Sequence, residues 1–169
     1  MPEYLYKVIV IGDNNVGKTS LLNRYVNNRY VDNCKSTVGV DFLLKVVHYD
    51  DSTLRMQFWD IAGQEYSKQL SRSYYKDANA CIIVFDITKR TTFDSVIQWK
   101  EEVDQKLGQI PTLILSNKYD LIMDPQNPRI SCIDDMDLDT LKDSIHATGC
   151  FQVICTSGEF HILRHNLSW

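Results

Sequence analysis

One short motif constrains this chain more than any other stretch. Residues Gly12–Thr19, with the sequence GDNNVGKT, fit the pattern G-x-x-x-x-G-K-S/T. The β-branched run before it, 5–11, predicts a strand, and 20–26 after it has apolar residues at helical spacing. Such a loop directs backbone N–H groups and the positive end of the helix dipole at an anion. The motif therefore predicts a nucleoside-phosphate site, in which Lys18 reaches the β- and γ-phosphates and Thr19 binds Mg²⁺.

Strand-like and helix-like segments alternate along the rest of the chain. Residues 80–86 and 112–116 are continuous apolar runs, as expected for parallel strands buried on both faces. The expected strands are 5–11, 41–49, 53–59, 80–86, 112–116 and 151–155, and the expected helices are 20–26, 92–106 and 135–147. This order predicts an α/β fold of the P-loop NTPase type. Its doubly wound, mostly parallel six-stranded sheet has helices on both faces and a ligand at the carboxyl ends of the strands.

Composition narrows the class of protein. The 169 residues suit one domain, and 44% hydrophobic and 24% charged residues are usual for a soluble globular protein. A net charge of −4 without a basic run argues against a nucleic-acid partner. The sequence has no long apolar run and no signal peptide, and its five cysteines are scattered. We therefore expect a cytoplasmic protein with reduced thiols.

A second motif bears on which base is bound. Asn117-Lys118-Tyr119-Asp120 directly follows the predicted strand 112–116. The aspartate can accept hydrogen bonds from N1–H and the exocyclic amine of guanine, and adenine has no such donor pair on that edge. The asparagine can contact N7, and the lysine stem can lie over the base plane. The motif therefore favours guanine over adenine.

These motifs together carry a family resemblance. Gly12–Thr19, Thr37, 60–64 (DIAGQ) and Asn117–Asp120 resemble the Ras superfamily of small GTPases. The resemblance runs from about Tyr4 to Cys155. It implies a GTP/GDP switch with slow, Mg²⁺-dependent GTP hydrolysis.

Further segments resemble the Rab branch of that superfamily, whose members regulate intracellular vesicle trafficking. Residues 38–42 (VGVDF) and 74–78 (YYKDA) are similar to motifs by which Rab proteins are distinguished. Ala62 stands where most Rab proteins have threonine. Together with 94–100 (DSVIQWK), this residue resembles the subgroup linked to lysosome-related organelles and phagosomes.

The resemblance assigns roles to individual residues. Lys18 is expected to neutralise phosphate charge and Gln64 to orient the attacking water, so these two are the candidate catalytic residues. Thr19, Thr37 and Asp60 are the candidate Mg²⁺ residues, with Asp60 acting through water. The candidate nucleotide-binding residues are Asn14, Asn15, Val16, Gly17, Lys18, Thr19, Ser20, Tyr30, Thr37, Gly63, Asn117, Lys118, Asp120, Ser157 and Gly158.

The resemblance also implies partners. Two loops, 31–39 and 63–75, would be ordered by the γ-phosphate and Mg²⁺ and released on hydrolysis. Effectors, exchange factors and GTPase-activating proteins would bind a monomeric chain through these loops. The expected effector surface comprises 38–42, Phe58, Trp59 and 66–75. An activating protein would supply an arginine in trans.

Some residues depart from the family pattern and leave an alternative open. Asn14 replaces a small residue beside the γ-phosphate, and Cys34 replaces a tyrosine that covers the nucleotide. These changes support a nucleotide-binding scaffold with little hydrolysis or cycling. An ATP-dependent kinase or ATPase is a second alternative, and Asp120 argues against it.

The last ten residues also depart from the family. Residues 1–159 are expected to form the GTPase domain, and 160–169 a short atypical segment that gives a helix of about 15 Å at most. The C-terminal helix is therefore expected to be short or missing, and stability to depend on bound nucleotide. No cysteine follows Cys155, so this chain has no expected prenylation site or membrane anchor. Membrane association is expected only for a full-length, prenylated form.

Overall fold

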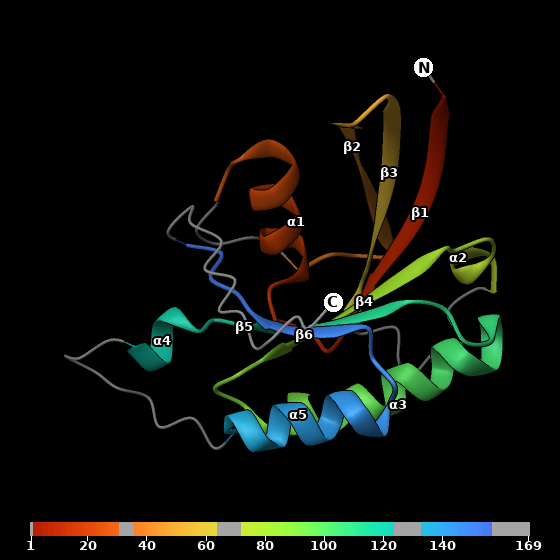
Figure 1. The fold of residues 1–169 in the computed structure, drawn as a ribbon. Coiled ribbons are helices and arrows are strands. Elements are labelled where there is room, and N and C mark those ends of the chain that lie inside the picture. Colours follow the sequence, from red (N-terminus) through yellow and green to blue (C-terminus); the bar gives the residue numbers. More distant parts are fainter. Residues whose placement is uncertain (1, 31–35, 64–71, 124–132, 157–169) are drawn as a thin grey trace.

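The computed structural model describes residues 2–30, 36–63, 72–123 and 133–156. It contains a six-stranded sheet with the strand order β2-β3-β1-β4-β5-β6 (Figure 1). The strands are β1 (Glu3–Ile11), β2 (Val40–Tyr49), β3 (Ser52–Ile61), β4 (Ala80–Asp86), β5 (Thr112–Asn117) and β6 (Gly149–Gln152). The helices are α1 (Lys18–Asn27), α2 (Arg72–Tyr75), α3 (Arg90–Leu107), α4 (Asp120–Met123) and α5 (Asp135–Ser144).

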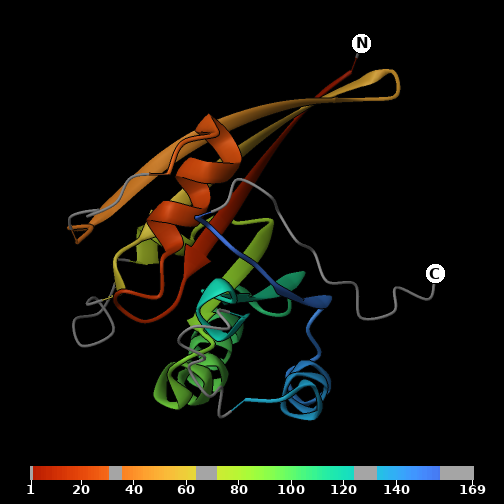
Figure 2. The same cartoon turned by 90° about the vertical axis from the view of Figure 1, so that its left-hand side faces the viewer.

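Helices cover both faces of the sheet. Helices α3 and α5 lie side by side on one face of the sheet, and α1 lies on the other (Figures 1 and 2). Strand β1 contributes side chains to the core on both faces of the sheet, because successive side chains of a strand point to opposite faces. Ile9 and Ile11 pack into the core under α3, whereas Val8 and Val10 pack into the core beside α1. The expected α/β architecture is confirmed.

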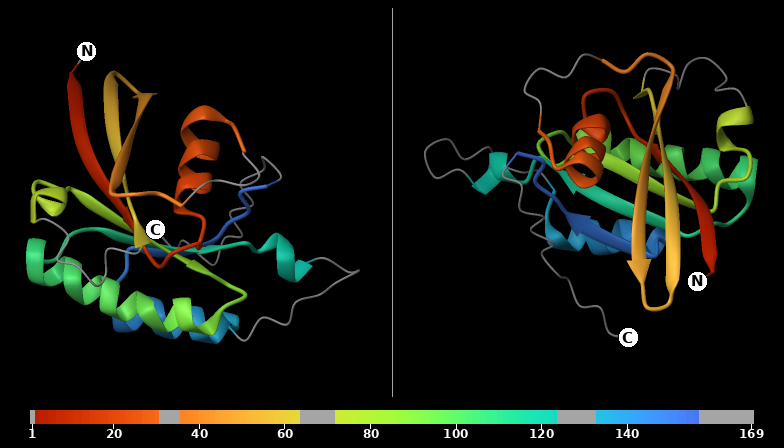
Figure 3. Two further views of the ribbon diagram at one scale, coloured as in Figure 1. Left: turned by 180° about the vertical axis from the view of Figure 1, so that it is seen from behind. Right: turned by 90° about the horizontal axis from the view of Figure 1, so that it is seen from above.

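The sheet is parallel except for one hairpin. Strand β1 pairs in parallel with β3 and β4, and β5 pairs in parallel with β4 and β6. Strand β2 runs antiparallel to β3, and the two form a long hairpin beside β1 (Figure 3). The carboxyl ends of β1, β4 and β5 therefore lie together. Across the described residues, none of the helices is long and apolar enough to span a membrane.

Several boundaries differ from the sequence expectations. The last strand is Gly149–Gln152, because Gly149 pairs with Leu113 and the chain leaves the sheet after Gln152. Helix α5 ends at Ser144 instead of Ala147. The single-turn helices α2 and α4 lie outside the expected helices and strands. The expectation of a short or missing C-terminal helix concerns 160–169, which lies outside the described residues.

Trp99 defines the buried face of α3. Its side chain lies in the core, whereas Ile97 on the same helix is 44% exposed. The two residues are two positions apart, and helical geometry separates them by about 200° around the axis. The larger side chain faces the sheet and reaches the loop after β1.

Candidate nucleotide site

The loop between β1 and α1 requires glycine at two positions. Gly12 has φ 136°, and a Cβ there would stand 2.1 Å from the Val84 carbonyl oxygen. Gly17 has φ 95°, and a Cβ there would stand 2.3 Å from Nδ2 of Asn117. Gly17 is also the N-cap of α1, and no side chain caps this helix. The first N–H groups of α1 are therefore not bonded to a cap side chain and can serve an anion.

Lys18 lies inside this loop. Its side chain is 6% exposed, and Nζ donates to the carbonyl oxygens of Gly12 and Asp13, each at 2.8 Å. Burial lowers the pKa of Lys18 to about 8, against the opposing effect of the Asp60 and Asp13 carboxylates. An anion beside this ammonium group would offset the cost of burial.

Thr19, Thr37 and Asp60 form a cluster of oxygen atoms. Thr19 Oγ1 lies 2.7 Å from Thr37 Oγ1 and 2.5 Å from Asp60 Oδ2, and Thr37 Oγ1 lies 3.5 Å from the same carboxylate oxygen. Asp60 is fully buried, and its Oδ1 has no hydrogen-bond partner among the described residues. Burial raises the pKa of Asp60.

This donor set fits Mg²⁺, which prefers hard oxygen ligands and keeps several waters. A buried carboxylate oxygen without a partner is costly unless a cation or a donor satisfies it. No group of three or more His, Cys, Asp or Glu side chains suited to a metal occurs in the described ranges. The three expected magnesium residues are therefore brought together, two of them through hydroxyl groups.

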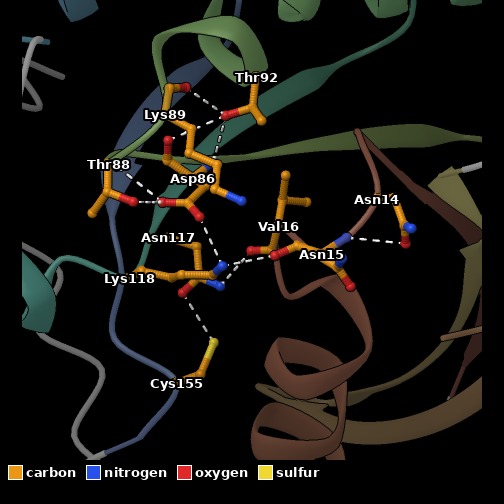
Figure 4. Close-up of polar contacts among 10 residues, drawn as sticks. All are labelled: Asn14, Asn15, Val16, Asp86, Thr88, Lys89, Thr92, Asn117, Lys118 and Cys155. Carbon is orange, nitrogen blue, oxygen red and sulfur yellow. Dashed lines mark hydrogen bonds and ion pairs between the residues drawn. The ribbon is translucent and has the colours of Figure 1, made fainter. Parts of the chain in front are cut away.

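The motif Asn117–Asp120 directly contacts the loop 12–17 between β1 and α1, which we call the phosphate loop after its expected role. Asn117 Nδ2 donates to the Val16 carbonyl oxygen at 2.8 Å, and Lys118 Nζ donates to the Asn15 carbonyl oxygen at 2.7 Å (Figure 4). Cys155 Sγ donates to Asn117 Oδ1 at 3.0 Å. Two sequence-distant motifs thus form one continuous site.

The remaining described candidates lie around this site. The Asp120 carboxylate accepts from the Thr156 hydroxyl at 3.3 Å, and Asn14 is exposed in the loop. Tyr30 is half-buried, with the Arg24 guanidinium 5.9 Å from its ring centroid. Ser20 is half-buried in the first turn of α1. Gln64, Ser157, Gly158 and Cys34 lie outside the described residues.

Gly63 packs closely on the phosphate loop. A Cβ at Gly63 would stand 2.4 Å from the backbone of both Asp13 and Asn14. Any larger residue would push the two segments apart. The structure therefore places Gly63 where its backbone faces the loop that would hold the phosphates.

The expected effector surface needs correction at two residues. Phe58 is buried and makes an edge contact with Tyr25 of α1, because alternation along β3 turns it to the opposite face from Trp59. Tyr75 is fully buried, and its hydroxyl donates to Glu102. Phe42 is 60% exposed and packs against Trp59 at 6.3 Å between ring centroids.

Sequence reasoning missed three residues that support the site. Trp99 Nε1 donates to Asp13 Oδ1 at 2.8 Å. Arg24 donates to the carbonyl oxygens of Cys155 and Thr156, each at 3.1 Å. Asp86 accepts from Lys118. The only sequence signal for Asp86 was an acidic residue ending an apolar strand.

The fold and the glycine loop define a P-loop NTPase architecture. Comparison with known proteins gives the family: residues 7–140 match the sequence model described as "Ras family". The chain belongs to the Ras family.

Individual relatives are of the Rab type. Ras-related protein Rab-7L1 of Rattus norvegicus is 50% identical over 125 residues, which cover 70% of this chain and 61% of the relative. Ras-related protein Rab-32A of Dictyostelium discoideum is 47% identical over 126 residues, covering 70% and 58%. Ras-related protein Rab-32 of Sus scrofa is 45% identical over 133 residues, covering 75% and 59%. The chain thus spans about three fifths of the length of these relatives, and its resemblance to Rab proteins is confirmed.

Proposed function

We propose that this protein is a Rab-type switch that binds GTP and GDP with Mg²⁺ and hydrolyses GTP slowly. The observation that carries the proposal is the pair of hydrogen bonds from Asn117 and Lys118 to the phosphate loop. These bonds join a phosphate site, which could serve any nucleotide, to the motif Asn117–Asp120, which favours guanine. Asp120 then supplies the acceptor for the guanine N1–H and amine.

Lys18 and the metal residues account for the phosphate end of the site. The Lys18 ammonium group would exchange its bonds to Gly12 and Asp13 for phosphate oxygens. Thr19, Thr37 and Asp60 would hold Mg²⁺, which when bound neutralises charge on the β- and γ-phosphates. Because Thr37 lies on the loop before β2, its contact with the metal would link that loop to the nucleotide state.

Hydrolysis is the second part of the proposal. Gln64 would orient the attacking water, and an arginine supplied by an activating protein would raise the rate by about 10³–10⁵. A scaffold with little hydrolysis is the alternative, favoured by Asn14 exposed in the phosphate loop.

The biological role follows from the Rab resemblance. We propose that the protein regulates vesicle trafficking in the cytoplasm as a monomer. Effectors, exchange factors and activating proteins would bind the switch loops, including the exposed Phe42 and half-buried Trp59. A full-length, prenylated form would associate with membranes.

The experiment measures guanine specificity and then hydrolysis. Purified protein is denatured, and the released nucleotide is identified by chromatography; we expect GDP or GTP. Asp120→Asn should weaken GTP binding and favour xanthine nucleotide, because the amide turns a double acceptor into a partial donor. Equal affinity of the unaltered chain for ATP and GTP would refute guanine specificity.

Single-turnover GTP hydrolysis then separates a switch from a scaffold. We expect slow hydrolysis that Gln64→Leu reduces with little change in affinity. Nucleotide binding without measurable hydrolysis would support the scaffold. An equal rate for Gln64→Leu and the unaltered chain would remove Gln64 from the mechanism.

A further inference from the structure

Asp86 is a buried carboxylate at the end of β4 and is not among the expected site residues. It is 1% exposed. Its neighbour across the sheet is Asn117, because β4 and β5 pair Asp86 with Asn117. Lys118, the residue after Asn117, donates a hydrogen bond from its ammonium group to Asp86 Oδ2 at 2.7 Å (Figure 4).

The other carboxylate oxygen is used within the turn after β4. Asp86 Oδ1 accepts from the Thr88 backbone N–H at 2.9 Å and from the Thr88 hydroxyl at 2.6 Å. Burial by itself would raise the pKa of Asp86, but the hydrogen bonds from Lys118 and Thr88 outweigh it and hold the pKa below its usual range. The two oxygens therefore have separate tasks, one in the turn and one toward Lys118.

Lys118 joins three parts of the site through one ammonium group. The same Nζ that donates to Asp86 donates to the Asn15 carbonyl oxygen at 2.7 Å. Lys118 has φ 65° and Asn15 has φ 62°, conformations that cost energy for residues other than glycine. The charge-assisted hydrogen bond that Lys118 donates to the buried Asp86 is strong enough to help hold these conformations.

We propose that Asp86 is a positioning residue for guanine nucleotide binding: its carboxylate fixes the Lys118 side chain between the base and the phosphate loop. With the head group held by Asp86 and Asn15, the aliphatic stem of Lys118 is kept extended as a surface for the base. Asp86 itself lies beneath and does not contact the nucleotide. This inference rests on the proposed function and deepens it.

The test uses the release rate of GDP carrying a fluorescent N-methylanthraniloyl group. Asp86→Asn keeps the shape of the side chain, but an amide has only one oxygen acceptor. It therefore cannot accept from Thr88 on one side and from Lys118 on the other, as the carboxylate does. Losing this charge-assisted bond should speed GDP release by about tenfold. Circular dichroism checks that the variant is folded.

Thr88→Val is the matched control. It removes a hydrogen bond from the same carboxylate but leaves the Lys118 bond and the backbone N–H bond in place. Its melting temperature can fall, but GDP release should stay within about twofold of the unaltered chain. If Thr88→Val speeds release as much as Asp86→Asn, the carboxylate only supports the turn and the inference is wrong.

A double-mutant cycle decides whether Asp86 acts through Lys118. Lys118→Met keeps the stem and removes the ammonium group, and it should also speed release. Adding Asp86→Asn to Lys118→Met should give no further increase, whereas independent effects would multiply and overturn the inference. The double variant leaves neither charge without its partner. Where Asp86→Asn alone does not fold, comparing the double variant with Lys118→Met still tests the inference, because faster release from the double variant would overturn it.

The outcomes also separate the two levels of the proposal. If the unaltered chain binds no guanine nucleotide, the proposed function is refuted and the inference with it. If the unaltered chain binds GDP and Asp86→Asn releases it at the same rate, only the inference is refuted.

Discussion

Replacing Trp99 by phenylalanine tests how α3 supports the phosphate loop. Trp99 is 1% exposed, and its indole N–H donates to Asp13 Oδ1 at 2.8 Å. The Asp13 carbonyl oxygen accepts from Lys18, so one residue links the core helix to the lysine that we propose binds phosphate. Trp99→Phe removes the hydrogen bond and part of the buried ring.

The cost can be estimated from these two losses. A hydrogen bond to a charged group contributes about 1.5–3 kcal/mol. Asp13 is half-buried and can regain water, so the lower end applies. The smaller ring loses roughly another 1 kcal/mol of apolar burial. The total of about 2.5 kcal/mol corresponds to a fall in melting temperature of about 5–10 °C at this chain length.

The assay is thermal unfolding with saturating GDP and Mg²⁺, together with GDP release. Ile97→Ala on the same helix is the control: Ile97 is 44% exposed and Trp99 only 1%, so the melting temperature should fall less than with Trp99→Phe. Trp99→Phe should also release GDP faster, because the loop that positions Lys18 is less constrained. Combining Trp99→Phe with Asp13→Ala should cost less than the sum of the two. Additivity within about 0.5 kcal/mol would refute the link.

Two further predictions concern titratable groups. Burial raises the pKa of Cys155 to about 11, so roughly one thiol in a thousand is ionised at pH 8. Iodoacetamide should therefore label Cys155 far more slowly than a free thiol, and rapid labelling seen by peptide mass spectrometry would contradict this. The pKa of Asp86 is held below its usual range, so its stabilising effect is complete above about pH 4 and is lost as pH falls through the lowered pKa. Asp86→Asn should flatten the acid limb of urea-unfolding stability, and an unchanged limb would be evidence against the ion pair.

Local patterns predicted the fold and the two main motifs well. The glycine loop was readable because Gly12 and Gly17 adopt conformations that other residues avoid. Asn117–Asp120 could be placed near this loop because carboxyl ends of parallel strands meet at one edge of the sheet. Neither inference needed a contact between particular side chains.

Side-chain contacts between distant segments were not predictable in this way. Trp99 and Asp13 are 86 residues apart, and Arg24 and Cys155 are 131 apart. No spacing rule joins such pairs, because their meeting depends on how α3 and α1 pack on the sheet. The wrong prediction for Phe58 has a different cause. Side chains alternate along a strand, so Phe58 and Trp59 must face opposite sides of the sheet and cannot both belong to one effector surface.

The way the two motifs are joined has a consequence for which residues can vary. Asn117 and Lys118 bind backbone carbonyl oxygens of Val16 and Asn15, so the Asn15 side chain, which is exposed, takes no part in the link. Substitution at Asn15 leaves its carbonyl acceptor in place, provided that the new residue tolerates φ 62° as asparagine and glycine do. Asn117 and Lys118, in contrast, make these bonds with their side chains. The Lys118 ammonium group is partly removed from water, so it needs an anion as well as a carbonyl oxygen. We therefore expect substitution of Asp86, whose carboxylate bonds Lys118, to disturb the link more than substitution of Asn15, which contributes only its backbone carbonyl oxygen.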